Sequence, residues 1–245
     1  MAELKPAQQD DTRDVRALLR GLPSLKGPYE PVDWESFPDT PNDAFVEWLR
    51  DAIRVGAAGS QAAALPYEPH AMTLSTVTAD GRPDARVLIL KNVDDRGWHF
   101  AAKAESPKGR QLQENAACSL TFYWSALGRQ VRIQGHAHPL PAEECAADFL
   151  SRPVASRISA LASRQSEVMA DYKQSAAQLA HQTKEVQALF NKDPNYISPG
   201  WLVYAVYPTE VEFWQGATDR QHGRLRYVRD EDGSRASWKK ERLWP

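Results

Sequence analysis

The chain has 245 residues, of which 42% are hydrophobic and 25% are charged, a composition typical of a soluble globular protein with a sizeable core. Its formal net charge of −2 argues against nucleic acid or an anionic membrane surface as the main partner. The two cysteines lack the spacing of a zinc site, the first residues lack the apolar core of a signal peptide, and no run of about 18 apolar residues occurs. We therefore expect a cytoplasmic protein with no metal site.

Residues 1–40 are polar and interrupted by prolines. This pattern predicts a partly flexible N-terminal arm that orders only against other parts of the molecule, with one short helix at 14–20. Residues 41–245 are expected to form one folded domain. The arm would then be separate from the part of the chain that carries the chemistry.

The folded domain is expected to open with a helix over 41–55, because apolar residues recur there at helical spacing. Thr40 offers an N-cap hydroxyl, and Pro41 suits the first helical position. Gly56 is expected to end this helix.

Strand patterns dominate the rest of the chain. Alternating apolar and polar residues predict a hairpin of strands 71–77 and 85–91 around a turn at 79–83. The other expected elements are strands at 98–102, 117–124, 130–137, 201–207, 210–214, 224–229 and 236–242, helices at 106–114 and 141–150, and a polar segment of helical propensity at 167–191. Because strands and helices do not alternate regularly, the fold class is α+β, built on a small barrel and not on a doubly wound sheet.

Phosphate binding, if present, must depend on side chains. The sequence contains no Gly-x-Gly-x-x-Gly and no Gly-x-x-x-x-Gly-Lys motif, and a Gly-x-Ser-x-Gly elbow is also missing. Arg86 and Lys91 lie five residues apart on an expected strand, so they face opposite sides unless the strand bends. Ser106 and Lys108 open an expected helix, where free N–H groups and a lysine favour an anion. Each cation taken alone is also consistent with an ordinary solvated surface charge.

The segment 211–227 near the C-terminus combines aromatic, cationic and imidazole groups. Arg220 and Arg224 flank His222, with Trp214 just upstream, so they could hold an anionic ring-bearing ligand by charge-assisted hydrogen bonds and stacking. The competing interpretation is a solvated strand end with one buried tryptophan.

The order of these patches resembles the pyridoxine/pyridoxamine 5′-phosphate oxidase family, flavoproteins with a split-barrel fold. The resemblance covers roughly residues 43 to 245. It rests on several short motifs in the family's order, which are Arg86-Val87-Leu88-Ile89-Leu90-Lys91, Ser106-Pro107-Lys108-Gly109, Gly128-Arg129-Gln130-Val131-Arg132, Ser151-Arg152-Pro153 with Ser156, Arg164-Gln165-Ser166, Glu212-Phe213-Trp214-Gln215-Gly216, Arg220-x-His222-x-Arg224 and Arg242-Leu243-x-Pro245.

The resemblance implies a homodimer with FMN at the subunit interface and an FMN-binding split β-barrel with flanking helices. The positions that resemble FMN contacts are Arg86, Lys91, Lys108, Gln130, Gln165, Ser166, Trp214 and Arg224. Those that resemble substrate contacts are Lys91, Arg152, Ser156, Arg220 and His222, the last two also as catalytic residues over the reacting ring. The implied reaction oxidises pyridoxine or pyridoxamine 5′-phosphate, a phosphorylated pyridine, to pyridoxal 5′-phosphate with oxygen as acceptor.

The chain also departs from the family's pattern. Asp148 stands where a tyrosine usually contacts the substrate phosphate, and a carboxylate there would repel that phosphate unless it turned away. Pro107 replaces a usual arginine beside the FMN phosphate, and Gln221 and Gly223 replace leucine and aspartate. The arm lacks an Arg-x-x-Tyr element, and residues 167–200 are longer and more polar than expected.

Two alternatives to vitamin B6 chemistry follow from these departures. The first is an oxidase that aromatises a reduced ring system in secondary metabolism, as the phenazine-biosynthesis relatives do; Asp148 favours it and Lys91 speaks against it. The second is a non-catalytic protein that binds flavin or pyridoxal phosphate, which the retained Arg220 and His222 disfavour.

Overall fold

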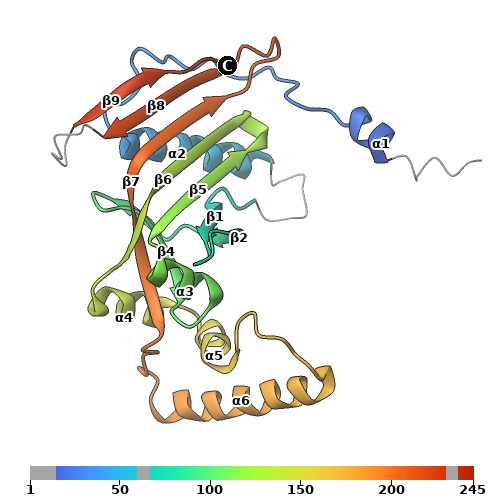
Figure 1. Cartoon of the computed structure of the whole chain (residues 1–245), viewed down its shortest axis with the longest axis vertical. Helices are drawn as coiled ribbons and strands as arrows, with labels where there is room; N and C mark the ends of the chain where they lie inside the picture. Colours follow the sequence, from blue (N-terminus) through green and yellow to red (C-terminus); the bar gives the residue numbers. More distant parts are fainter. Residues whose placement is uncertain (1–14, 60–66, 230–236) are drawn as a thin grey trace, which may run out of the picture.

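In the computed structural model, residues 15–59, 67–229 and 237–245 are described, and their strands form one antiparallel sheet (Figure 1). The strand order is β2-β1-β5-β6-β7-β4-β3, with β8 paired to β7 and β9 paired to β8. The strands are β1 Ala71–Val77, β2 Pro83–Ile89, β3 Asn92–Asp94, β4 Gly97–Lys103, β5 Ala117–Trp124, β6 Arg129–Pro139, β7 Trp201–Gln215, β8 Gly223–Arg229 and β9 Trp238–Arg242. The sheet curls into a half-barrel with helices at its sides, which confirms the expected α+β split-barrel fold.

The β7 strand forms the spine of the molecule. It pairs with β6 along its length, with β4 through its first half and with β8 through its second half. The prediction of two strands at 201–207 and 210–214 was wrong, because β7 continues through Pro208. The β6–β7 register shifts between Gln134 and Gly135, opposite Pro208, so the proline meets the sheet at an irregularity. A Cβ on Gly135 would lie 2.0 Å from the Tyr207 carbonyl oxygen, which explains the glycine.

The helices are α1 Val15–Gly21, α2 Pro41–Gly59, α3 Pro107–Glu114, α4 Ala142–Ser151, α5 Val154–Ala162 and α6 Tyr172–Lys192, with a short 3₁₀ turn, η2, at Ser125–Leu127. The expected cap of α2 is confirmed, since the Thr40 hydroxyl accepts a hydrogen bond of 3.2 Å from the Asp43 N–H. The expected end at Gly56 is wrong, because α2 runs to Gly59. A Cβ on Gly56 would lie 1.8 Å from the Tyr67 ring, so this glycine makes room for the ring.

Several elements went unrecognised in the sequence. The helix α5 was missed although Val154, Ile158 and Leu161 stand at helical spacing, and β3 is only three residues long. In the polar segment 167–191, the helix begins only at residue 172, where Asp171 caps it by accepting from the Gln174 N–H at 2.9 Å. Every helix in the three described segments is too short or too polar to cross a bilayer.

The main core lies between α2 and the concave face of the sheet. Phe45 of α2 lies 4.8 Å from Phe122 and 5.5 Å from Trp98, and Trp48 lies 5.2 Å from Phe213, measured between ring centroids. A second, smaller cluster of Phe149, Ile158 and Phe190 holds α4, α5 and α6 together below the sheet (Figure 1). The protein therefore has two ends, one built from β7–β9 and α2 and the other from α4–α6.

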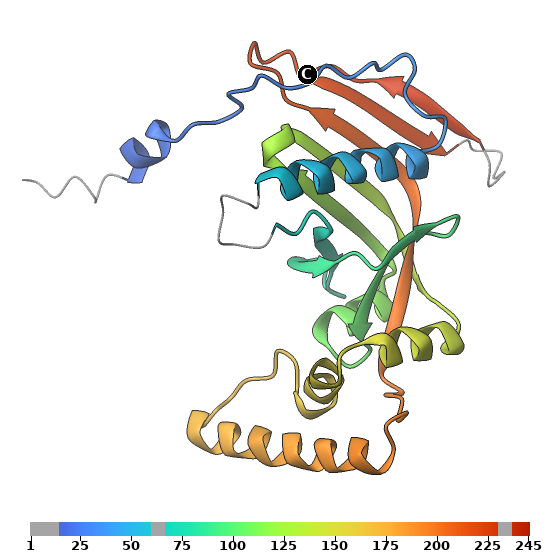
Figure 2. The same cartoon turned by 180° about the vertical axis from the view of Figure 1, so that it is seen from behind.

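The segment before α2 lies along the β7–β9 end. The Tyr227 hydroxyl donates to the Pro38 carbonyl at 2.5 Å, the Gln215 amide donates to Glu30 at 2.9 Å, and Lys240 donates to Phe37 at 2.7 Å. In contrast, α1 has no buried residue and stands away from the sheet (Figures 1 and 2). Residues 1–14 lie outside the described residues, so the division into an arm of 1–40 and a domain of 41–245 stays a prediction.

Candidate active site

A cavity of about 370 Å³ lies between β2, α3 and the chain after α5, and it is lined by Arg86, Lys108, Gln165 and Ser166 among others. Arg86 of β2 donates to the Thr76 hydroxyl at 2.6 Å and to the Leu74 carbonyl at 3.3 Å, and it pairs with Asp84. These contacts hold the guanidinium in one place. Four of the expected FMN positions are thus neighbours in the structure.

Lys108 is 7% exposed and donates to the Gln165 side chain at 3.0 Å. Burial lowers the pKa of Lys108, and the positive charge of Arg86 lowers it further. The Ser106 hydroxyl caps α3 by accepting from the Gly109 N–H at 3.2 Å, so the positive end of the helix faces the same region. Arg86 and Lys108 therefore repel each other beside the N-terminus of α3. An anion such as the phosphate of FMN would relieve this repulsion, so the site suits one.

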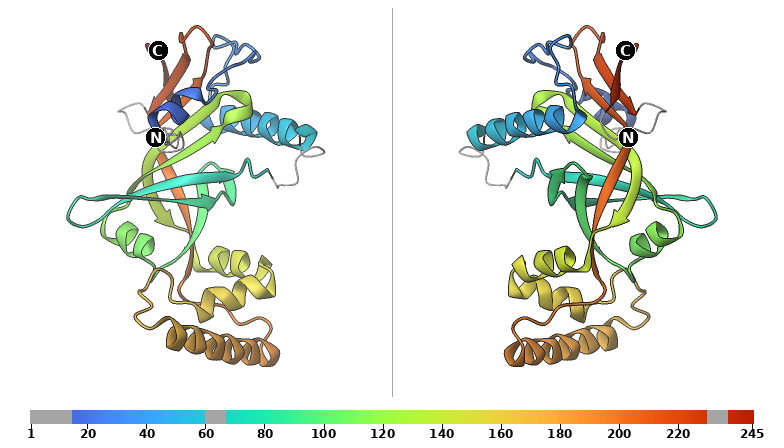
Figure 3. Two further views of the ribbon diagram at one scale, coloured as in Figure 1. Left: turned by 90° about the vertical axis from the view of Figure 1, so that its right-hand side faces the viewer. Right: turned by 90° about the vertical axis from the view of Figure 1, so that its left-hand side faces the viewer.

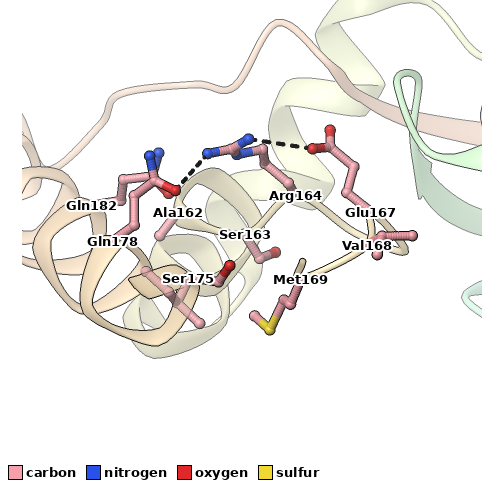
Figure 4. A pocket seen from close by; sticks show the side chains of 10 residues that line it. Ala162, Ser163, Arg164, Glu167, Val168, Met169, Ser175, Gln178 and Gln182 are labelled. Carbon is pink, nitrogen blue, oxygen red and sulfur yellow. Dashed lines mark hydrogen bonds and ion pairs between the residues drawn. The ribbon is translucent and has the colours of Figure 1, made fainter. Parts of the chain in front are cut away.

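The loop after α5 carries Gln165 and Ser166 into this cavity. The Lys103 ammonium donates to the Ser163 carbonyl at 2.6 Å, and Arg164 donates to Gln178 of α6 at 2.9 Å and pairs with Glu167 at 3.4 Å (Figure 4). Ser166 has a φ of +68°, a backbone conformation that residues other than glycine rarely adopt. The surrounding contacts therefore hold a strained backbone at an expected binding position.

A second cavity, of about 560 Å³, adjoins the first and shares Leu88, Lys108 and Gln165 with it. Arg152 and Ser156, two expected substrate positions, line it together with Trp201. The Arg152 guanidinium lies 3.9 Å from the centre of the Trp201 ring, in cation–π contact. The two cavities are therefore neighbours, and cationic side chains line both of them.

Lys91 does not lie on β2, as the sequence suggested, but two residues beyond its end. Its N–H donates to the His99 carbonyl at 2.8 Å, and its ammonium lies 3.2 Å from a carboxylate oxygen of Asp148. Asp148, expected to repel an anion, is therefore neutralised by a cation of its own chain.

The remaining site positions come together at the other end of the sheet. Gln130, Trp214 and Arg224 lie side by side on β6, β7 and β8, because Gln130 pairs with Trp214 and Trp214 pairs with Arg224 in the strand register. The His222 ring lies 4.9 Å from the Trp214 ring between centroids. Arg220 has a φ of +68° and is exposed. A second strained residue thus lies at an expected functional position.

A backbone hydrogen bond determines which tautomer the neutral His222 ring adopts. Its Nδ1 accepts a hydrogen bond of 3.0 Å from the Ala217 N–H, so the neutral ring carries its proton on Nε2. That nitrogen is the one available to donate to a ligand.

The chain places its site residues in two separate groups. One group, with Arg86, Lys108, Arg152, Ser156 and Gln165, belongs to the cavities beside β2, α3 and α5. The other group lies on β6–β8 and in the β7–β8 connection. The elements α5 and β8 lie at opposite ends of the molecule in every view (Figures 1 and 3). A single copy therefore does not bring the two groups together.

Two models of known protein families match this chain. Residues 59–184 match the family model described as pyridoxamine 5′-phosphate oxidase, and residues 201–245 match the pyridoxine 5′-phosphate oxidase C-terminal dimerisation region. The chain belongs to the pyridoxine/pyridoxamine 5′-phosphate oxidase family. A family member from Pseudomonas paraeruginosa is 42% identical over 85% of this chain and 90% of its own length. Another, from Pseudomonas putida, is 40% identical over 99% of this chain and 98% of its own length.

Solved structures agree with this assignment. The structure of PhzG from Burkholderia lata in complex with tetrahydrophenazine-1-carboxylic acid is 32% identical, with a TM-score of 0.76, and covers 89% of this chain and 100% of that chain. An FMN-binding, pyridoxamine 5′-phosphate oxidase-related protein from Nostoc punctiforme has a TM-score of 0.60 at 16% identity, covering 80% of this chain and 96% of that chain. This second likeness shows the fold alone.

Other residues of this family member support the site, although the sequence did not indicate a role for them. Glu212 is 4% exposed, and its carboxylate accepts from Arg224 at 2.8 Å and from Arg132 at 3.1 Å, which orients both guanidinium groups. An acidic residue inside an apolar strand was the signal available for it. Thr76 orients Arg86 in the same way, and nothing in its local sequence marked that role.

Proposed function

We propose that the protein is an FMN-dependent oxidase that converts pyridoxine or pyridoxamine 5′-phosphate to pyridoxal 5′-phosphate, with oxygen as the acceptor. The observation that carries this proposal is the pair of adjoining cavities, one with Arg86 and Lys108 and one with Arg152 and Ser156. This arrangement suits two phosphate groups, one on the cofactor and one on the substrate. Relatives named for this activity are 40–43% identical to the chain.

In this proposal the first cavity holds the cofactor. Arg86 and Lys108 bind the FMN phosphate, while Gln165, Ser166 and Gln130 offer hydrogen bonds to its ribityl chain or ring. Trp214 supplies apolar cover, and Arg224, oriented by Glu212, supplies a further cation. When bound, FMN supplies the group that accepts a hydride equivalent from the C4′ carbon of the substrate.

The substrate is held by its phosphate and its ring. Arg152 and Ser156 bind the phosphate in the second cavity, and Lys91 is linked to that cavity through Asp148, which bonds the lining residue Trp201. Arg220 and His222 face the reacting ring, and His222 donates from Nε2 because its Nδ1 is already engaged. These contacts fix the C4′ carbon relative to the cofactor.

The active site requires a homodimer in this proposal. Within one chain the group around Arg152 and the group around His222 lie at opposite ends, so one active site takes one group from each subunit. The match of residues 201–245 to a dimerisation region supports this arrangement, because those residues include His222 and Arg224.

The test is to purify the protein, measure its flavin absorbance and identify FMN after denaturation. Oxidation of pyridoxine 5′-phosphate is then followed by pyridoxal 5′-phosphate and peroxide formation. A phenazine-type oxidation is the second candidate, favoured by the likeness to PhzG, whose solved structure contains a reduced phenazine carboxylic acid. Turnover of a reduced polycyclic acid with none of the B6 phosphates would replace the first function. Bound FMN without turnover of either substrate would indicate a flavin-binding protein without catalysis.

A further inference from the structure

Asp148 of α4 engages partners with both of its carboxylate oxygens. Oδ1 lies 3.2 Å from the Lys91 ammonium nitrogen, and Oδ2 accepts a hydrogen bond of 2.8 Å from Nε1 of Trp201. The side chains of Lys91 and Asp148 are 32% and 17% exposed, so their ion pair is partly shielded from water. The Lys91 ammonium is thereby directed to a carboxylate of its own chain.

Trp201 connects this ion pair to the second cavity. Asp148 holds the indole by its N–H, and the Arg152 guanidinium stacks on the indole at 3.9 Å from the ring centre. Nη1 of Arg152 is buried and has no hydrogen-bond partner among residues 15–59, 67–229 and 237–245. A buried N–H group without a partner is costly, and an anion in the cavity would satisfy it.

We infer that Asp148 sets the anion affinity of this cavity, because it pairs with Lys91 and so keeps that ammonium from a phosphate held by Arg152 and Ser156. The inference rests on the proposed function, since it takes the substrate's phosphate as the anion. Lys103, Lys108 and Arg152 line the cavity, and a Lys91 released from Asp148 would add a further positive charge to them. Asp148 acts through Lys91 and is a positioning residue. The protein then binds phosphorylated substrate more weakly than its cations would allow.

The experiment uses 4-deoxypyridoxine 5′-phosphate, which has no oxygen on C4′ and is not oxidised, and its dephosphorylated form. Binding of both is measured by titration calorimetry on the FMN-loaded protein. Asp148→Asn keeps an acceptor for Trp201 but removes the charge, so it should tighten binding of the phosphate ester about ten-fold. Binding of the dephosphorylated compound should change less than about two-fold. Glu144→Gln is the control, since Glu144 lies on the same helix and pairs with Arg96 at 2.7 Å.

A double-mutant cycle with Lys91→Met separates pairing from simple repulsion. In the wild-type background Lys91→Met should weaken binding of the phosphate ester, because it leaves the Asp148 carboxylate without its cation. In the Asp148→Asn background it should remove most of the ten-fold gain. A double variant, Asp148→Asn with Lys91→Met, that kept the ten-fold gain would overturn the inference, because Asp148 would then act without Lys91.

Two further outcomes separate this inference from the proposed function. Equal affinity of wild type and Asp148→Asn for the phosphate ester, with pyridoxine 5′-phosphate still oxidised, would overturn the inference alone. Failure of both proteins to bind either compound, with FMN retained, would remove the proposed substrate and the inference with it.

Discussion

At the scale of single residues, the FMN-phosphate assignment depends on Arg86 and Lys108. Lys108→Met should weaken FMN binding by about 1.5–3 kcal/mol, because it removes a buried charge-assisted contact that Pro107, without an N–H, does not replace. Fluorescence titration of the apoprotein with FMN measures the change. Arg110→Met is the matched control, since Arg110 is exposed on the same helix. Unchanged FMN affinity in Lys108→Met would assign this lysine a structural role only.

His99 gives a residue-scale prediction about pH. It is 2% exposed, its Nε2 lies 3.0 Å from Asp94, and burial lowers its pKa below the ordinary value of 6.5. The unfolded chain binds this proton at higher pH than the folded one, so unfolding takes up a proton below about pH 6.5. Stability contributed by neutral His99 is therefore complete above that pH and is lost as the pH falls through the lower folded pKa.

The measurement compares melting temperatures at pH 7.5 and 5.5. Wild type should lose stability across this interval, and His99→Gln, which keeps an N–H donor, should lose less. His181→Gln is the control, because the His181 side chain is 73% exposed on α6. Parallel pH profiles of wild type and His99→Gln would contradict the prediction. Hydrogen bonds from Arg96 hold the pKa of Glu144 below its ordinary value of 4.5, so this carboxylate titrates below the tested range.

At the scale of elements, α6 supports the loop that carries Gln165 and Ser166. The Arg164–Gln178 hydrogen bond of 2.9 Å joins loop and helix (Figure 4). Gln178→Ala should weaken FMN binding by roughly 0.5–1.5 kcal/mol, since the strained backbone at Ser166 loses one of its supports. FMN titration tests this, with Gln187→Ala as control because Gln187 is exposed on the same helix and donates a hydrogen bond of 3.1 Å to its helix neighbour Asn191. A loss of FMN affinity in Gln187→Ala as large as that in Gln178→Ala would falsify the positioning role of α6.

At the scale of the whole molecule, the two groups of site residues predict complementation between subunits. Arg152→Ala and His222→Ala homodimers should both be nearly inactive. After co-refolding of equal amounts, about half of the dimers should be mixed, and each mixed dimer should contain one intact site of two. About a quarter of wild-type activity should therefore return. Steady-state oxidation of pyridoxine 5′-phosphate measures it. A mixture as inactive as its components would show that one subunit supplies both groups.

What the sequence by itself determined was local or depended on the order of short motifs. Thr40 caps its helix as expected, because a cap needs only a hydroxyl a few residues from the N–H from which it accepts. The family and the fold were predicted from short motifs spread over the chain. These motifs occur in the family's order although the chain departs from the family's pattern at other positions, such as Asp148 and Pro107. Most strands were also recognised, because side chains on the two faces of a strand alternate.

The tertiary structure decided what depends on residues far apart in the chain. Asp148 reaches Lys91, Pro208 is accommodated by a shift in β6, and Gly56 leaves room for the Tyr67 ring. Local periodicity contains no information about these partners, because each contact follows from how the curled sheet brings distant segments together. The separation of Arg152 from His222 has the same origin. The sequence named both residues, and only the path of β7 placed them at opposite ends of one subunit.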